Sequence, residues 1–358
     1  MSRFGIYEFD AIQKVLENGC RTSHNGVMVK KAEAELCKRF NKPALCFCNG
    51  TAPIHTALEA LDVTGKLVFT TPLTMAATTI AIQEAGGQPV FCDVDADNWT
   101  ISYEAVKNRM EAFSSHKHKF GAIIAVSLYG HPIDPRLAQL GVPLIHDAAQ
   151  SVPVLDNFSD FITLSFQASK IITCGEGGAL LFGHAQKDKY DWCNSFHSLG
   201  YGNYPIDKTD PDADRHEMYR SFNYRMSDFQ AAVLYGQLRH LDELIEHRDI
   251  IADGFGFILD QFTMPQQTFK YGRNYWAKPF LHERPKNFLT AYRAFGGEGG
   301  YAAWKLTYQE PAMEKIFCGY GICPTAEYLQ PRIVALSNNM ALPERSYQAL
   351  RKTLERCK

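Results

Sequence analysis

The sequence lacks the patterns that would assign it to a membrane or to a nucleic acid. No apolar run approaches the roughly 18 residues that suggest a membrane-spanning helix, and the opening residues MSRFGIYEFD do not have the basic-then-apolar layout of a signal peptide. The formal net charge is -2, without a block of like charge, so nothing indicates binding to nucleic acid or to an anionic membrane. We therefore expect a cytoplasmic protein that binds neither.

A metal site or a disulfide framework is not expected either. The ten cysteines form no CxxC pair and no Cys/His cluster at zinc spacing. Several lie inside apolar runs such as PALCFC and PVFCDV, where a thiol behaves as a small buried hydrophobe. We interpret them as reduced structural cysteines of a cytosolic protein.

The 358 residues predict a globular α/β protein in two parts. With 46% hydrophobic and 21% charged residues the composition is ordinary, and the length suggests a large domain at 1–249 and a small one at 250–358. Helical segments at 76–85, 103–112 and 135–140 alternate with apolar runs, which predicts a mostly parallel sheet covered on both faces. A polar loop at 201–220 precedes a long helical pattern at 227–249. The predicted strands are 67–71, 88–94, 122–127, 143–146, 161–166 and 179–182.

Ligands of such sheets bind beyond the carboxyl ends of strands, so the residues that follow each strand matter most. The first such stretch is NGTAPIHTALEAL, from Asn49. A glycine turn at Gly50 that opens a helix offers free N–H groups to a phosphate, and Thr51 adds a hydroxyl. An ordinary helix cap by Asn49 or Thr51 explains this stretch at least as well when it is taken alone.

Two further stretches place ionisable side chains at strand ends. In VPLIHDAAQS, Asp147 follows an apolar run, where a carboxylate is costly unless it is paired; a helix cap at Asp147 is an equal explanation. In ITLSFQASK, Lys170 follows the next strand, either as a solvated loop lysine or as the amine of a site. The turn TCGEGGALLF then returns the chain beneath Lys170, although GEGG alone indicates only a turn.

Together these stretches supply what pyridoxal phosphate requires. The cofactor needs an anion site, a carboxylate that keeps its pyridine nitrogen protonated, and an amine that forms a Schiff base with it. The order of a phosphate turn, an aspartate, a lysine and a glycine turn is more informative than any one of them.

A set of ordered motifs resembles a known family. These motifs resemble the nucleotide-sugar aminotransferases of the DegT/DnrJ/StrS type, which are fold type I pyridoxal-phosphate enzymes. The resemblance is close over residues 26–247 and loose in the C-terminal third. It implies a large, mostly parallel sheet domain with helices on both faces and a small C-terminal α/β domain. The motifs are NGTAPIHTALEAL, TTPLTMAATTIAIQEAGGQPVFCDVD, LYGHPID, HDAAQS, SFQASKIITCGEGGALL and SFNYRMSDFQAAVLYGQL.

The resemblance also assigns roles near the cofactor. It implies that Lys170 is the Schiff-base lysine, that Asp147 pairs with the pyridine nitrogen and that Gln150 lies over the ring. The phosphate is then held at the turn by Gly50, Thr51 and Ala52, together with Ser165. The motif NYRM would reach the cofactor site of a neighbouring subunit through Asn223 and Arg225, which implies a homodimer with shared active sites.

This sequence departs from the family near the substrate. Met75 stands where an aromatic residue usually stacks on the ring, Ser127 replaces a histidine before LYG, and the segment between Gln150 and Phe161 is shorter. Tyr308 takes the place of a C-terminal histidine motif. By position, Trp304, Lys305 and Tyr308 line the sugar pocket, although packing explains these three residues equally well.

The resemblance implies a transaminase. L-glutamate would donate the amino group to a keto group at C4 or C3 of a nucleotide-linked deoxy-sugar by a ping-pong mechanism. The product would serve the biosynthesis of amino sugars, of surface polysaccharides such as the lipopolysaccharide O-antigen, or of secondary metabolites. The alternatives are a cyclitol ketone as acceptor, or a non-catalytic protein that binds the cofactor or a nucleotide sugar. Sugar 3-dehydratases of the family carry histidine at the lysine position, so Lys170 argues against that reaction.

Overall fold

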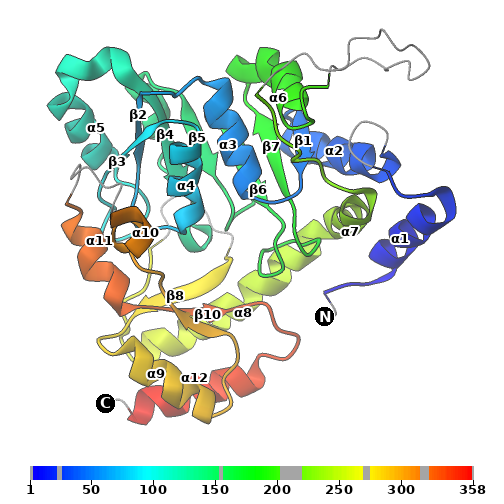
Figure 1. The fold of residues 1–358 in the computed structure, drawn as a ribbon. Helices are drawn as coiled ribbons and strands as arrows, with labels where there is room; N and C mark the ends of the chain where they lie inside the picture. The colour runs from blue at the N-terminus through cyan, green and yellow to red at the C-terminus, as the bar shows by residue number, and fades with distance from the viewer. Residues whose placement is uncertain are drawn as a thin grey trace, which may run out of the picture.

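The computed structural model describes residues 3–21, 26–152, 156–201, 220–268, 275–314 and 322–356. These residues form a large unit around one sheet and a smaller unit around a second sheet (Figure 1). The loop predicted at 201–220 lies almost wholly outside the described residues. Within those residues, no helix is both long enough and apolar enough to span a membrane, and the cysteines are free thiols.

The main sheet has seven strands in the order β1-β7-β6-β5-β4-β2-β3 within the described chain. From β6 to β3 all neighbouring strands are parallel, and β7 runs antiparallel to both β1 and β6. This mostly parallel sheet confirms the predicted fold class. The strands are β1 (Ala44–Phe47), β2 (Leu67–Thr70), β3 (Gln88–Phe91), β4 (Phe120–Val126), β5 (Leu144–Asp147), β6 (Phe161–Ser165) and β7 (Gly178–Phe182).

Helices cover both faces of the main sheet, because alternate side chains of each strand point to opposite faces. Ile124 and Ile145 pack against α3 and α4, whereas Ile123 and Leu144 pack on the opposite face, beside α5. Farther along that second face the sheet packs against α1, α2 and α7. The helices are α1 (Ile6–Asn18), α2 (Val27–Phe40), α3 (Thr51–Ala60), α4 (Ala76–Glu84), α5 (Tyr103–Ala112), α6 (Tyr190–Phe196) and α7 (Asp228–Arg239).

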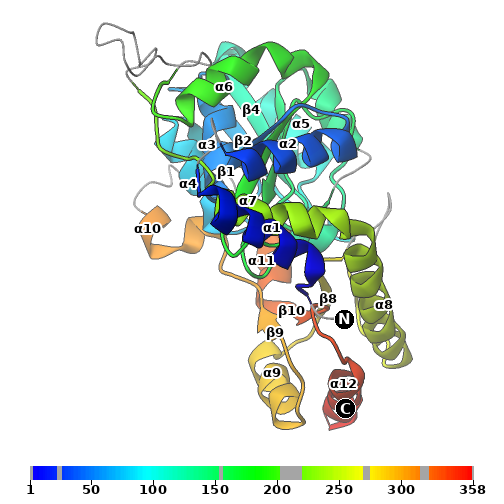
Figure 2. The ribbon, with the colours of Figure 1, turned by 90° about the vertical axis from the view of Figure 1, so that its right-hand side faces the viewer.

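The smaller unit contains an antiparallel sheet in the order β8-β10-β9. Its core is formed with α8, α9 and α12, and Figure 2 shows α9 and α12 at the end of the molecule that lies away from the main sheet. The elements are α8 (Leu241–Gln261), β8 (Ala277–Leu281), α9 (Pro285–Ala294), β9 (Gly300–Ala302), α10 (Pro311–Glu314), α11 (Pro324–Leu329), β10 (Ile333–Ser337) and α12 (Glu344–Arg356).

The single helix predicted at 227–249 is wrong. The chain forms two helices, α7 and α8, which meet at His240, where the backbone leaves helical geometry at φ -127 and ψ 27. The buried residues Leu234, Leu241 and Leu244 keep helical spacing across the break, so the periodic pattern could not reveal it. Because α8 continues to Gln261, the boundary proposed between residues 249 and 250 falls inside this helix, and the division into two domains stays a prediction.

Candidate active site

Lys170 lies in the bend that follows β6 and is only 9% exposed. Its ammonium nitrogen Nζ lies 5.2 Å from the centre of the Trp276 ring. Burial lowers the pKa of Lys170 from its ordinary value, and the negative charges of Asp147 and Glu176 act in the opposite direction. Lys170 is therefore a buried amine and not a solvated loop lysine.

Asp147 is the last residue of β5 and is 4% exposed. The hydroxyl of Thr78 donates a hydrogen bond to Asp147 Oδ2 at 2.8 Å, and the backbone N–H of Ala149 donates to Oδ1 at 3.2 Å. Burial raises the pKa of Asp147, while the Thr78 hydrogen bond and the charge of Lys170 oppose this effect. No helix begins at residue 148, so Asp147 is not a helix cap, and its carboxylate lines the cavity that also contains Lys170.

The turn before α3 lies against the end of β6 and the start of β7. A Cβ atom added at Gly50 would lie 2.7 Å from Ser165 Cβ and Oγ, and one at Gly178 would lie 2.2 Å from the carbonyl oxygen of Asn49. Contacts this close exclude larger residues, so these glycines allow the turn, the Ser165 hydroxyl and the GEGG segment to meet.

The helix cap and the phosphate turn coincide at this point. Asn49 Oδ1 accepts hydrogen bonds from the backbone N–H groups of Thr51 and Ala52, at 3.0 and 2.9 Å. The cap that the sequence offered as an alternative is therefore present. A phosphate that binds these two N–H groups has to replace Asn49 Oδ1, whereas the hydroxyls of Thr51 and Ser165 need no such exchange.

One cavity of about 690 Å³ collects most of the predicted site residues. Its lining includes these residues from the sequence prediction: Gly50, Thr51, Met75, Asp147, Gln150, Ser165, Lys170 and Trp304. Gln150 is anchored there, since its Oε1 accepts a hydrogen bond from the backbone N–H of Tyr129 at 2.6 Å.

Five predicted residues do not line this cavity. Ala52 is buried in the first turn of α3. Lys305 is exposed beside Trp304, and Tyr308 is buried and donates its hydroxyl hydrogen to Glu327 Oε1 at 2.8 Å. Asn223 and Arg225 lie on a segment that forms isolated bridges with Ser198 and with Phe47 at the end of β1.

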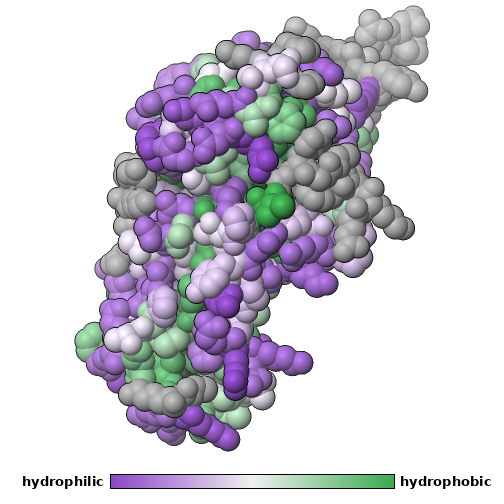
Figure 3. Space-filling model, turned by 90° about the vertical axis from the view of Figure 1, so that its left-hand side faces the viewer, coloured by the Kyte–Doolittle hydropathy of each residue, from purple (hydrophilic) through white to green (hydrophobic). Residues whose placement is uncertain are grey.

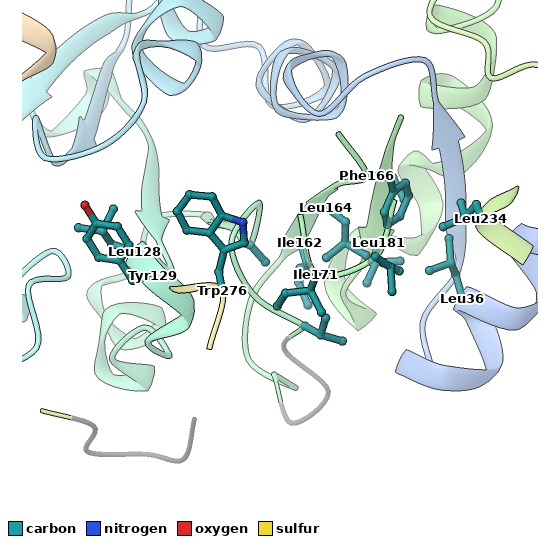
Figure 4. Close-up of a cluster of buried hydrophobic side chains, with 14 of the residues drawn as sticks. Leu36, Leu128, Tyr129, Ile162, Leu164, Phe166, Ile171, Leu181, Leu234 and Trp276 are labelled. Carbon is teal, nitrogen blue, oxygen red and sulfur yellow. The ribbon is translucent and has the colours of Figure 1, made fainter. Parts of the chain in front are cut away.

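Sequence reasoning missed several lining residues. Thr78 belongs to α4. The small residues at the start of this helix, AATT, gave no signal that the hydroxyl of one threonine would bind Asp147. Trp276 precedes β8 and packs against Tyr129 with ring centres 6.1 Å apart, and Figure 4 shows it between Tyr129 and Ile171. Tyr301 of β9 also lines the cavity. The sequence could not place these aromatics, because they reach the cavity from the second sheet.

Comparison with known proteins identifies the family. The model of the DegT/DnrJ/EryC1/StrS aminotransferase family matches residues 5–291. The chain belongs to this family. The resemblance seen in the sequence motifs is confirmed.

Two curated relatives illustrate the sequence relationships of the chain. The chain is 30% identical over 248 residues to GDP-perosamine synthase of Escherichia coli O157:H7, a match that covers 64% of this chain and 63% of that protein. It is 31% identical over 258 residues to UDP-4-amino-4,6-dideoxy-N-acetyl-beta-L-altrosamine transaminase of Campylobacter jejuni, covering 69% and 65%. The matches therefore span slightly less than two thirds of the length of these relatives.

A solved structure agrees over nearly the full length. The crystal structure of 3-amino-5-hydroxybenzoic acid synthase superposes with a TM-score of 0.85 at 24% identity, covering 99% of this chain and 97% of that one. At this identity the likeness establishes the fold, which is fold type I.

The cavity wall has two parts with different exposure. We call four of the buried lining residues, Thr78, Asp147, Gln150 and Lys170, the floor, and three of the exposed ones, Met75, Glu176 and Trp304, the mouth. Met75 is 51% exposed and Trp304 44%.

The molecular face in Figure 3 is mostly hydrophilic, with hydrophobic residues in small groups.

Proposed function

We propose that this protein is a pyridoxal-phosphate-dependent aminotransferase that moves an amino group from L-glutamate to a keto group, at C4 or C3, of a nucleotide-linked deoxy-sugar. The observation that carries the proposal is the floor. A buried amine and a buried carboxylate, Lys170 and Asp147, share one cavity with a glycine turn at a helix N-terminus. Family membership and the names of the two sugar-modifying relatives agree with it.

The residues present fit the cofactor. The close contact of Gly50 with Ser165 forms a cradle that a larger side chain would fill, and α3 directs its N-terminus toward it. Thr51 and Ser165 would hold the phosphate with their hydroxyls, and Ala52 with its N–H once Asn49 has moved. Gln150 and Met75 would lie beside the ring. When bound, pyridoxal phosphate supplies an aldehyde that condenses with amines and a ring that accepts electrons.

Lys170 and Asp147 then have separate tasks. Asp147, held by Thr78, would keep a proton on the ring nitrogen through its negative charge. Lys170 Nζ would bond covalently to the cofactor aldehyde and, once a donor amine has taken its place, its free amine would accept and return protons. The lowered pKa of Lys170 increases the fraction of neutral amine at physiological pH, and only the neutral amine can take up a proton.

The acceptor would enter past the mouth, where Trp304 offers an exposed aromatic face. A nucleotide-linked sugar suits such a surface, because bases and sugar rings stack on aromatic side chains. We include Lys305 and Tyr308 in this proposal only as neighbours of Trp304. The product would serve amino-sugar or surface-polysaccharide synthesis, and we place the enzyme in the cytoplasm.

We further propose a homodimer whose subunits share their active sites. Asn223 and Arg225 do not line the cavity of their own chain, and Arg225 donates a hydrogen bond to Ser198 Oγ at 3.4 Å there, so a role in a partner's cavity is what we propose for both. Large apolar side chains stay exposed on one chain, among them Ile6 and Phe9 of α1 and Phe229 of α7, and such side chains are often covered in an assembly.

Mixing two inactive variants tests the shared site. Lys170→Ala and Asn223→Ala proteins should each be inactive alone, whereas co-refolded mixtures should regain activity, because a mixed dimer has one site without either substitution. Mixtures that remain inactive, although mass measurement finds mixed dimers, would contradict sharing.

A substrate panel tests the reaction itself. The protein is loaded with pyridoxal phosphate, given L-glutamate, and offered nucleotide-linked keto-sugars and cyclitol ketones, and the products are identified by mass. An amino-sugar product supports the proposal, and an amino-cyclitol alone would move the acceptor to the other class. No amine product, together with no loss of visible colour on adding glutamate, would favour a non-catalytic binding protein.

A further inference from the structure

The backbone carbonyl of Lys170 is bound by two arginines. Arg248 Nη2 donates a hydrogen bond to Lys170 O at 2.9 Å. The Arg3 guanidinium donates to the same oxygen through Nη2, and to Ala168 O through Nη1 at 2.6 Å. Hydrogen bonds from ionised donors are the stronger kind, so the peptide of this lysine is fixed more firmly than an ordinary bend.

Arg248 is buried in α8 and is 3% exposed. Within the described residues, no carboxylate forms an ion pair with it. Burial, with the charge of Arg3 as a smaller cause, lowers the pKa of Arg248 to about 9, so it is still a cation at neutral pH. Burying an unpaired cation is costly, which makes a role in general packing a poor explanation for this residue.

The other acceptors of Arg248 belong to the smaller unit. Its Nη1 donates to Asn338 Oδ1 at 3.0 Å and to Trp276 O at 3.3 Å. Asn338 Nδ2 in turn donates to the carbonyl oxygens of Tyr275, at 2.8 Å, and of Arg248, at 3.2 Å. The guanidinium therefore joins the Lys170 bend to the residue before β8 and to the residue after β10.

Trp276 also holds the Lys170 bend, through its indole side chain. Its Nε1 donates to Ser169 O at 2.8 Å, and its ring packs against the Lys170 amine. The backbone of Trp276 is the segment that Arg248 binds. The lysine peptide and the wall against which its amine lies are thus held by one guanidinium.

We propose that Arg248 is a positioning residue for Lys170, with Arg3 in a weaker supporting role. By fixing the Lys170 carbonyl relative to Trp276, it sets the point from which the flexible side chain reaches the cofactor aldehyde. This inference rests on the proposed function, in which Lys170 bonds covalently to that cofactor.

The rate of covalent capture is the first test. Apoprotein is mixed with saturating pyridoxal phosphate, quenched with borohydride at intervals, and mapped for modified Lys170 by peptide mass. We expect Arg248→Lys to slow capture about tenfold and Arg3→Gln about threefold, with the equilibrium affinity for the cofactor phosphate unchanged. Arg351→Lys, a distant surface arginine that donates to Gln261, should behave as wild type. Wild-type capture rates in both Arg248→Lys and Arg3→Gln would overturn the proposal.

A second test separates positioning from general damage. In Lys170→Ala protein, added methylamine can replace the missing amine, so turnover no longer depends on where residue 170 points. Adding Arg248→Lys to this background should leave the methylamine-supported rate within about twofold, whereas an equal loss in both backgrounds would overturn the proposal. If Arg248→Lys does not fold, Arg3→Gln decides the same comparison, because it removes only the outer guanidinium.

The two tests also separate this inference from the proposed function. If Lys170 is never modified in wild-type protein, or if Lys170→Ala keeps full turnover, the proposed role of Lys170 fails. If Lys170 is modified and needed but the Arg248 and Arg3 variants are indistinguishable from wild type, only the positioning role fails.

Discussion

The floor and the mouth of the cavity are built in different ways. On the floor, Asp147 receives two hydrogen bonds, Gln150 is fixed by Tyr129, and the carbonyl of Lys170 is held by Arg248 and Arg3. At the mouth, Met75 and Trp304 are about half exposed. A reacting group has to be held in one geometry, whereas a recognition surface tolerates variation. The floor therefore indicates the chemistry, and the mouth leaves the acceptor open.

The largest effect should come from removing the amine of the floor. Lys170→Ala should lower turnover by about 10⁴-fold, the upper end for a positioned acid–base group, since no other amine reaches the cavity from the described residues. The apoprotein should still bind pyridoxal phosphate, because the phosphate turn is unchanged. Steady-state kinetics and equilibrium dialysis measure the two quantities, and turnover near the wild-type rate would remove Lys170 from the mechanism.

Asp147→Asn should have the second largest effect, with opposite consequences for activity and stability. We expect turnover to fall by about 10²-fold to 10³-fold, comparable to losing one preorganised electrostatic group. The amide keeps the shape of the side chain but cannot hold a proton on the ring nitrogen through its charge.

The stability of the apoprotein should change in the other direction. Burial raises the folded-state pKa of Asp147, so the native state is destabilised at a pH above that value, and this cost disappears below the ordinary value of 3.8. Asp147→Asn should therefore raise the melting temperature at pH 7, and the difference from wild type should shrink as the pH falls toward 4. A pH-independent difference, or a lower melting temperature at pH 7, would contradict the assigned cause.

The same contrast explains what the sequence could predict. Asp147 ends a buried strand and Lys170 follows one, and parallel strands bring their carboxyl ends to one edge. Neither pattern identified its residue alone, but the order of the motifs predicted that both side chains lie in one site. Arg248 and Trp276 belong to α8 and to the entry of β8, and no local signal directs them to Lys170. The break at His240 was also hidden, because the buried leucines keep their spacing across it. Contacts between the two units depend on tertiary packing, which periodicity does not encode.

At the mouth, adjacent residues provide a matched pair. Trp304→Ala should raise the KM for the sugar acceptor about tenfold, because a partly buried aromatic contact is worth on the order of 1–2 kcal/mol. Lys305→Ala should change it less than twofold, since Lys305 does not line the cavity. The capture of cofactor by Lys170 should be unaffected in both variants. Equal KM changes in the two would show that the mouth extends farther than the lining residues suggest.

Met75 tests the border between the two regions, with the smallest expected effect. A thioether beside an aromatic ring contributes roughly 0.3–1.5 kcal/mol, and a stacked aromatic roughly 0.5–1.5 kcal/mol, so Met75→Phe should lower the Kd of the cofactor about threefold. Met75→Leu controls for side-chain size, and it should weaken binding slightly because it lacks the polarisable sulfur. Since Met75 is 51% exposed, the larger ring can be accommodated without displacing Thr78 from Asp147. If Met75→Phe instead weakens cofactor binding and also raises the KM for the acceptor, residue 75 lies on the path of the acceptor. The mouth would then extend farther into the cavity than the exposure of Met75 implies.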